Sequence, residues 1–167
     1  MGLDMYLYRV NNKVKGFVGM DFEKLKEDDE NIYKALEPYL FEKGNYVHWM
    51  DITEDVGYWR KANEIHNFFV EEAQNGVDDC REHEVPKEVL EDLLDKCKEI
   101  MTAYKEDEDD WQIIARDLLP TQGGFFFGST DYDDWYIDDI DKTISIISKV
   151  LNETDFDTHS IFYCSSW

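Results

Sequence analysis

Alternating apolar residues at the start of the chain predict a β-strand. Over residues 3–10, large apolar side chains occupy both sets of alternating positions, and successive side chains of a strand point to opposite faces of a sheet. We therefore expect a central strand that is covered on both faces. A second strand is predicted at residues 46–50, glycines bound a candidate strand at residues 123–128, and residues 160–167 alternate again. This last segment should return the end of the chain to the sheet.

Helical periodicity, with apolar residues three and four positions apart, recurs through the rest of the chain. It predicts a helix over residues 53–73, with acidic residues in its first turn, and a second over residues 86–104, which begins at a proline. About ten residues connect the two, so we expect them to pack as an antiparallel hairpin. Residues 111–119 predict a short helix, residues 137–151 a final amphipathic helix, and residues 22–43 one or two short helices.

Strands at both ends of the chain with helices between them predict an α+β fold. In that fold the sheet is mainly antiparallel, a helical hairpin occupies about residues 53–104, and an amphipathic helix lies near the C-terminus. The 167 residues correspond to one domain and no linker divides them, so residues 1–167 are expected to form a single domain. No run approaches ~20 apolar residues and no leader-like segment opens the chain, which predicts a cytoplasmic protein without membrane spans.

The charge balance narrows the classes of partner. Acidic residues outnumber basic ones by 39 to 17, which gives a net charge of −22. A protein that binds the nucleic-acid backbone needs a basic surface to displace counterions from phosphates, and an anionic membrane would repel this chain. We therefore expect no direct binding to nucleic acid or to membranes. The charge favours a partner with a basic protein surface.

Two histidines and two cysteines fall at positions where they could bind a metal ion. On the predicted helices, His66 and Cys97 lie about 14 and 16 Å from the connecting loop at 1.5 Å per residue, so they should face each other at similar heights. Cys80 lies in that loop, and His83 follows it in a C-x-x-H spacing. Zinc prefers such sulfur and nitrogen ligands. The alternative is that Cys97 packs in the core and that His66 is hydrogen-bonded at a helix interface.

Other chemical motifs are incomplete. The glycines within residues 123–128 lack the lysine and hydroxyl residue of a phosphate-binding loop, and the aspartates within residues 131–141 lack the glycine and final glutamate of an EF-hand. These aspartates are expected to form a solvated face. No serine lies in a G-x-S-x-G turn. Glu64, two residues before His66, should lie on another face of its helix, so the sequence offers no general base beside a metal there.

Three stretches taken together resemble a family of small proteins from phages and prophages of bacteria. They are the opening MGLDMYL, the segment GYWRKANEIH at residues 57–66 and the segment GFFFGST at residues 124–130, and the ending SSW agrees with them. The positions of His66, Cys80 and Cys97 recur in that family, whereas His83 does not, so the resemblance leaves the fourth zinc ligand open. Some members carry the label phosphoglycerate kinase, which a chain of 167 residues without a phosphate loop does not support.

The phage setting implied by this resemblance suggests a role against host defence. The leading hypothesis is a protein without enzymatic activity that binds and inhibits a host nucleic-acid-handling defence protein, as anti-CRISPR inhibitors of Cas9 do, with zinc as a structural stabiliser. One alternative is a small metal-dependent enzyme, with zinc open to water at His66, Cys80 and Cys97. Another is a housekeeping phage protein whose charge serves solubility.

Overall fold

The computed structural model describes residues 2–12, 53–106 and 110–167, together with positions 26, 27, 30, 31, 33, 34 and 37. The predicted strand at residues 46–50 and most of the predicted helical stretch at residues 22–43 lie outside the described residues. The main described elements, in chain order, are β1 (Asp4–Asn11), β2 (Thr53–Arg60), α3 (Asn63–Glu72), β3 (His83–Val85), α4 (Lys87–Lys105), α5 (Trp111–Leu118), α6 (Asp134–Glu153) and β4 (His159–Ser166).

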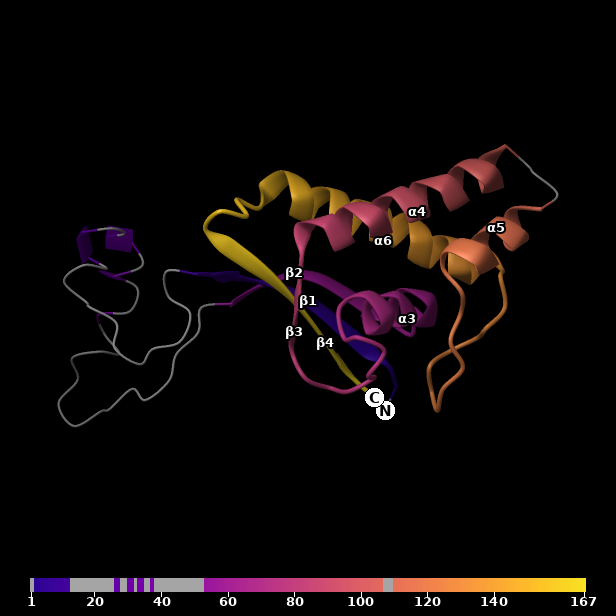
Figure 1. Cartoon of the computed structure of the whole chain (residues 1–167), viewed down its shortest axis with the longest axis horizontal. Coiled ribbons are helices and arrows are strands. Elements are labelled where there is room, and N and C mark those ends of the chain that lie inside the picture. The colour runs from indigo at the N-terminus through magenta and orange to yellow at the C-terminus, as the bar shows by residue number, and fades with distance from the viewer. Residues whose placement is uncertain are drawn as a thin grey trace.

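These strands form one antiparallel sheet in the order β2-β1-β4-β3, so the first and last strands of the chain are neighbours in its middle. Asp4 pairs with Ser166 and Asn11 pairs with His159, which brings the two ends of the chain together (Figure 1). Helices α4 and α6 run alongside each other and pack together, and α6 also contacts β2 (Figure 1). The predicted α+β class with a mainly antiparallel sheet is confirmed.

The hydrophobic core lies between one face of the sheet and the helices. Met5 and Leu7 of β1 and Leu3, which directly precedes it, alternate along the chain and are completely buried, and Tyr163, the β4 partner of Leu7, is buried with them. Burial of one large apolar side chain stabilises a fold by about 1.5–3 kcal/mol, so these residues hold the middle of the sheet against the helices. The other face of β1 is covered less evenly than predicted, because Tyr6 is 37% exposed.

The prediction of a helix over residues 53–73 is wrong for its first part. Thr53–Arg60 form β2, and α3 begins only at Asn63. Over so short a segment, apolar residues three positions apart also fit an irregular strand, and pairing with β1 decides between the two by satisfying the backbone of both strands. A Cβ atom at Gly57 would lie 2.8 Å from Cγ2 of Ile146, so the glycine allows α6 to approach β2 closely.

The hairpin and the terminal elements agree with the prediction more closely. Helices α3 and α4 follow each other within residues 53–104, although β3 lies between them and adds an edge strand next to β4. The helices predicted at residues 111–119 and 137–151 are confirmed as α5 and α6, and the predicted final strand is β4. Within the part of the chain that the structure describes, no helix is long and apolar enough to cross a membrane.

The prediction of a strand at residues 123–128 is wrong. These residues belong to a long loop between α5 and α6, which we call the 120–133 loop. Its backbone cannot remain extended, because Phe126 has a φ of 67° and Gly128 has a φ of 104°. Glycines next to aromatic residues are common both at strand ends and in loops, and the run of apolar residues did not distinguish the two.

Candidate functional site

A cavity of about 510 Å³ lies where the end of β2, the first turn of α3, the 120–133 loop and the start of α6 meet. Its volume is within the range of about 300–1,000 Å³ that is typical of sites for small ligands. Most of the side chains that line it are polar or charged, and several are carboxylates. This concentration of ionisable groups around a concave surface makes the cavity the candidate functional site.

Asn63, the first residue of α3, connects the loop to the helix. Its side chain is almost completely buried, and its Nδ2 donates to the carbonyl oxygens of Phe127, at 3.3 Å, and Ser129, at 2.7 Å. Its Oδ1 accepts from the backbone N–H of Gln122 at 2.8 Å. One amide side chain therefore satisfies three backbone groups of the 120–133 loop, which holds the loop in place as one wall of the cavity.

Glu64 follows Asn63 and is the most deeply placed acid of the cavity. Its side chain is only 3% exposed, and its Oε1 has no hydrogen-bond partner among the described residues. Burial raises the pKa of Glu64 to about 8, the negative charge of Asp139 adds to this effect, and a hydrogen bond from its own backbone N–H opposes it. At neutral pH this carboxyl group is therefore mostly protonated.

Asp139 supplies a second carboxyl group to the same cavity from α6. Burial raises its pKa to about 6, Lys142 lowers it, and Asp138 raises it further. The position of this turn of α6 is set by Thr143, whose hydroxyl donates to the carbonyl oxygen of Asp139 at 2.7 Å and accepts from Nε1 of Trp59 at 2.9 Å. The core tryptophan of β2 thus positions the acid relative to the sheet.

Aromatic side chains are exposed on the 120–133 loop and at the start of α6. Phe125 and Phe126 of the 120–133 loop are 84% and 50% exposed, and their ring centroids lie 4.1 Å apart. Trp135, which lines the cavity, is 76% exposed. It lies in the first turn of α6, where the Asp133 carboxylate accepts from its backbone N–H at 3.0 Å and caps the helix. The site therefore combines buried carboxyl groups with large apolar side chains open to solvent.

The histidine predicted as a zinc ligand has other partners. His66 lies on α3, is completely buried, and its Nδ1 is 2.7 Å from the hydroxyl oxygen of Tyr163. Its Nε2 lies 3.2 Å from Oδ1 of Asp78, a charge contact that is not aligned as a hydrogen bond. The carboxylate favours a proton on Nε2, and Nδ1 then accepts from the tyrosine hydroxyl. Burial lowers the pKa of His66, while Asp78 raises it.

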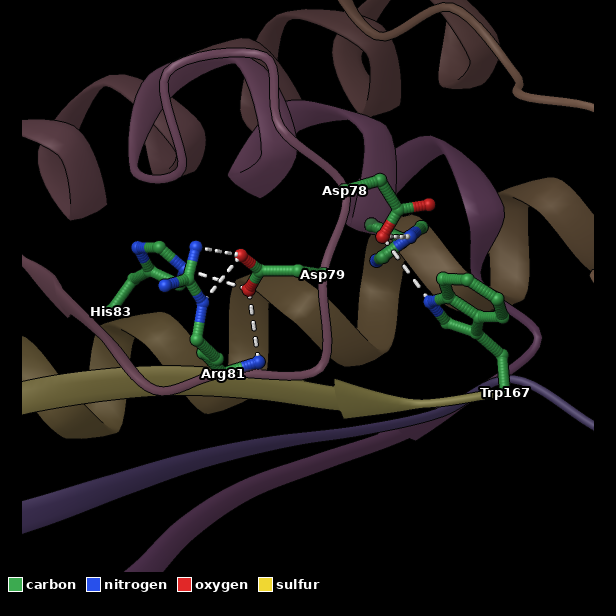
Figure 2. Close-up of polar contacts among 6 residues, drawn as sticks. Asp78, Asp79, Arg81, His83 and Trp167 are labelled. Carbon is green, nitrogen blue, oxygen red and sulfur yellow. Dashed lines mark hydrogen bonds and ion pairs between the residues drawn. The ribbon is translucent and has the colours of Figure 1, made fainter.

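Two of the other predicted ligands lie close together in the chain, Cys80 in the loop between α3 and β3 and His83 as the first residue of β3. Figure 2 shows the contacts of His83. His83 contacts Oδ1 of Asp79 through Nε2 at 3.0 Å, and Nε of Arg81 donates to Oδ2 of the same carboxylate at 2.7 Å. These hydrogen bonds lower the pKa of Asp79 well below its usual range, and the one from Arg81 has the largest effect. Cys80 lies between Asp79 and Arg81 in the chain and is exposed.

Cys97, the last of the predicted ligands, is packed in the hydrophobic core. It is completely buried on α4, where burial and the nearby Glu64 raise the pKa of its thiol. Among the described residues, no three His, Cys, Asp or Glu side chains form a group that could hold a metal ion. Zinc binding by His66, Cys80, Cys97 and His83 therefore stays a prediction that this geometry does not support.

Sequence reasoning missed the residues of the cavity. Glu64 was considered only as a base beside zinc, yet it shares a helix face with the buried Phe68, four residues later. An acid on a buried helix face is the one signal that could have identified it. The aspartates of α6 were expected to be solvated, which does not hold for Asp139, because burial raises its pKa.

No family model, curated protein or solved structure matches this chain. The function is therefore inferred from the cavity, its charges and the exposed aromatic residues.

Proposed function

We propose that this protein acts by binding a basic surface of a partner protein, and that the partner is a host defence protein that handles nucleic acid, of the Cas9 type. The observation that carries the proposal is the exposure of Trp135, which lines a cavity with several carboxyl groups, together with that of Phe125 and Phe126 on the loop that forms one wall of this cavity. Bound in a nucleic-acid channel of the partner, the protein would exclude guide RNA or DNA sterically.

The exposed aromatic residues support a protein partner. Large apolar side chains are costly to leave in water, and clusters of them on a surface mark interaction sites. Trp is among the residues that dominate the energy of protein interfaces, and such anchors work best when surrounding contacts exclude water. Phe125 and Trp135 are more than three-quarters exposed in this structure, so burying both against a partner would release a large apolar area from water.

The charge of the same region supports a basic partner. Residues 131–141 contain six aspartates and no lysine or arginine, and the whole chain carries a net charge of −22. Opposite charge on a partner would raise the rate of encounter and orient the two surfaces before the aromatic residues make contact. We therefore expect the association rate to fall as salt screens the charges.

An inhibition assay tests this proposal directly. The protein is added to purified Cas9 before or after the guide RNA, and guide binding and DNA cleavage are measured at low and near-physiological salt. We expect inhibition that is strongest when the protein is added first and that weakens with salt. The double variant Phe125→Ser/Trp135→Ser should inhibit much less, whereas Val77→Ser, which changes a side chain that is 56% exposed between α3 and β3, outside the 120–133 loop and α6, should inhibit like the wild type.

Two results would count against the proposal. Equal inhibition by the double variant and by Val77→Ser would show that the aromatic residues do not contact the partner. An association rate that does not change with salt would remove the role of charge. If Cas9 itself is unaffected, the same variants are compared for retention of proteins from nuclease-treated host lysate, where a band retained equally by all three proteins would also contradict the proposal.

A further inference from the structure

We propose that the cavity receives the guanidinium group of an arginine side chain of the partner, with the carboxyl group of Glu64 as its innermost contact. The inference rests on the proposed function, because it names the group of the basic partner that enters the acidic site. It depends on an observation separate from the exposed aromatic residues, namely a buried acid that lines the cavity and has an unpaired oxygen.

The unpaired oxygen of Glu64 calls for a hydrogen-bond donor. The side chain is 97% buried, and Oε1 has no partner within the described residues. A buried acceptor that stays unpaired is costly, and a ligand that donates a hydrogen bond removes this cost. A guanidinium group offers five N–H donors in a planar arrangement that matches carboxylate oxygens, whereas an anion would meet the acids of the cavity without donating to them.

Few charges act on Glu64 from the elements packed around it. Asp139 of α6 adds negative charge, while the Cys97 thiol of α4 and the Tyr136 hydroxyl of α6 have pKa values that burial raises, so both stay neutral at ordinary pH. The inner part of the cavity is therefore acidic. A cation that enters it meets Asp139 first and then favours the ionised form of Glu64.

Each basic side chain of the lining lies near a group other than Glu64. Arg60 lies near Asp4, with Nε 3.9 Å from the carboxylate, and Nζ of Lys142 lies 5.5 Å from the centre of the Tyr58 ring. Lys61 lies near Gly2, because a Cβ atom on this glycine would lie 3.5 Å from its Cε. Lys142 does act on Asp139, whose pKa it lowers, but within the described residues no basic side chain shifts the pKa of Glu64, so the inner carboxyl group is without a positive partner.

Trp135 adds a reason to prefer guanidinium over ammonium. Its indole lines the cavity and is 76% exposed, so one face of the ring is available to a ligand. The planar and weakly hydrated guanidinium group stacks on aromatic rings better than the compact ammonium group of lysine does. Arginine is also over-represented where proteins recognise phosphate groups through two parallel hydrogen bonds, which fits the class of partner that we propose.

A titration with an isolated arginine side chain tests the inference. The full-length protein is titrated with N-acetyl-arginine methylamide, and the binding constant is measured by NMR between pH 6 and pH 8.5. We expect binding to tighten as pH rises, because Glu64 ionises over this range. Glu64→Gln should weaken binding about tenfold or more, through loss of a charge-assisted hydrogen bond, and should remove the pH dependence above pH 7, where Asp139 is already ionised. Glu88→Gln, the same change in the exposed first turn of α4, should have no effect.

Several results would overturn the inference. One is the absence of saturable binding, and another is equal affinity in Glu64→Gln and Glu88→Gln. Equal affinity of the wild type for N-acetyl-lysine methylamide would remove the preference for guanidinium. Asp139→Asn, with its melting temperature measured, serves as a second variant and should also weaken binding. Inhibition that Phe125→Ser/Trp135→Ser abolishes but Glu64→Gln leaves intact would overturn this inference and keep the proposed function. Arginine binding without any inhibition would support this inference and count against the proposed function.

Discussion

The carboxyl groups of Glu64 on α3 and Asp139 on α6 line one cavity, and the charge of Asp139 adds to the burial that raises the pKa of Glu64 to about 8. Asp139 itself has a pKa raised to about 6. At pH 7 the first group is therefore mainly protonated and the second mainly ionised. A site of this kind can release a proton when a cation binds, and it stores unfavourable free energy in the unliganded fold at alkaline pH.

The stability of the protein should depend on pH through Glu64. Its folded-state pKa of about 8 is higher than the ordinary value of 4.5, so the folded chain retains a proton that the unfolded chain has lost. The contribution of Glu64 to the free energy of unfolding is thus fully present below about pH 4.5 and is lost as pH rises towards 8. The free energy of unfolding falls by up to about 1.4 kcal/mol per pH unit over this range. We expect Glu64→Gln to become progressively more stable than the wild type over this range.

Urea unfolding of the wild type and Glu64→Gln at pH 5, 6, 7 and 8 measures this difference. Glu88→Gln, at an exposed position, controls for the removal of one negative charge. A constant difference in the free energy of unfolding between Glu64→Gln and the wild type would show that Glu64 ionises normally.

The hydrogen bond between Nδ1 of His66 and the hydroxyl of Tyr163 should contribute to stability. Both side chains are completely buried, and the atoms lie 2.7 Å apart. Tyr163→Phe keeps the ring but leaves Nδ1 unpaired, which should lower the free energy of unfolding by about 1–3 kcal/mol. Thermal or urea unfolding measures the effect. Tyr104→Phe, at a position that is 36% exposed on α4, should change stability little, and equal effects of the two changes would contradict the assignment.

Gly57 should be intolerant of a side chain because α6 packs directly on it. A Cβ atom there would lie 2.8 Å from Cγ2 of Ile146, and overpacking a core by one methyl group costs about 1–3 kcal/mol. We expect Gly57→Ala to lower the free energy of unfolding by this amount, and Gly57→Ala combined with Ile146→Ala to show a smaller loss than the sum of the two single variants. Gly123→Ala, where no atom lies within 4 Å of the new Cβ, is the matched control.

Elemental analysis of protein purified without chelator tests the zinc prediction. Binding by the predicted set requires about one equivalent of zinc, together with a melting temperature that EDTA lowers. Cys80→Ser is the informative variant, since Cys80 is exposed and its replacement disturbs no core packing. Metal-free protein whose melting is unchanged by added zinc would leave Cys97 as a core residue and His66 as a hydrogen-bonded one.

Local pattern predicted the parts of the fold that one segment can specify by itself. Helices α4, α5 and α6 and the two terminal strands carry enough turns or alternating positions for their period to be clear. The segment at residues 53–60 did not, because its few apolar residues fit either period, and its state depends on a partner strand that is distant in sequence. The 120–133 loop was missed for a similar reason, since Asn63, far from it in the chain, satisfies its backbone groups.

The sequence by itself determined the class of fold and a net charge of −22, because periodicity and composition are properties of the chain alone. Only the tertiary structure decided which acid is unusual. Glu64 and Glu88 both lie in the first turn of a helix, and the difference between them is that the 120–133 loop and α6 close around Glu64 and remove it from water. The pKa of a carboxyl group follows its solvation and its neighbours, and these exist only once distant segments have packed together.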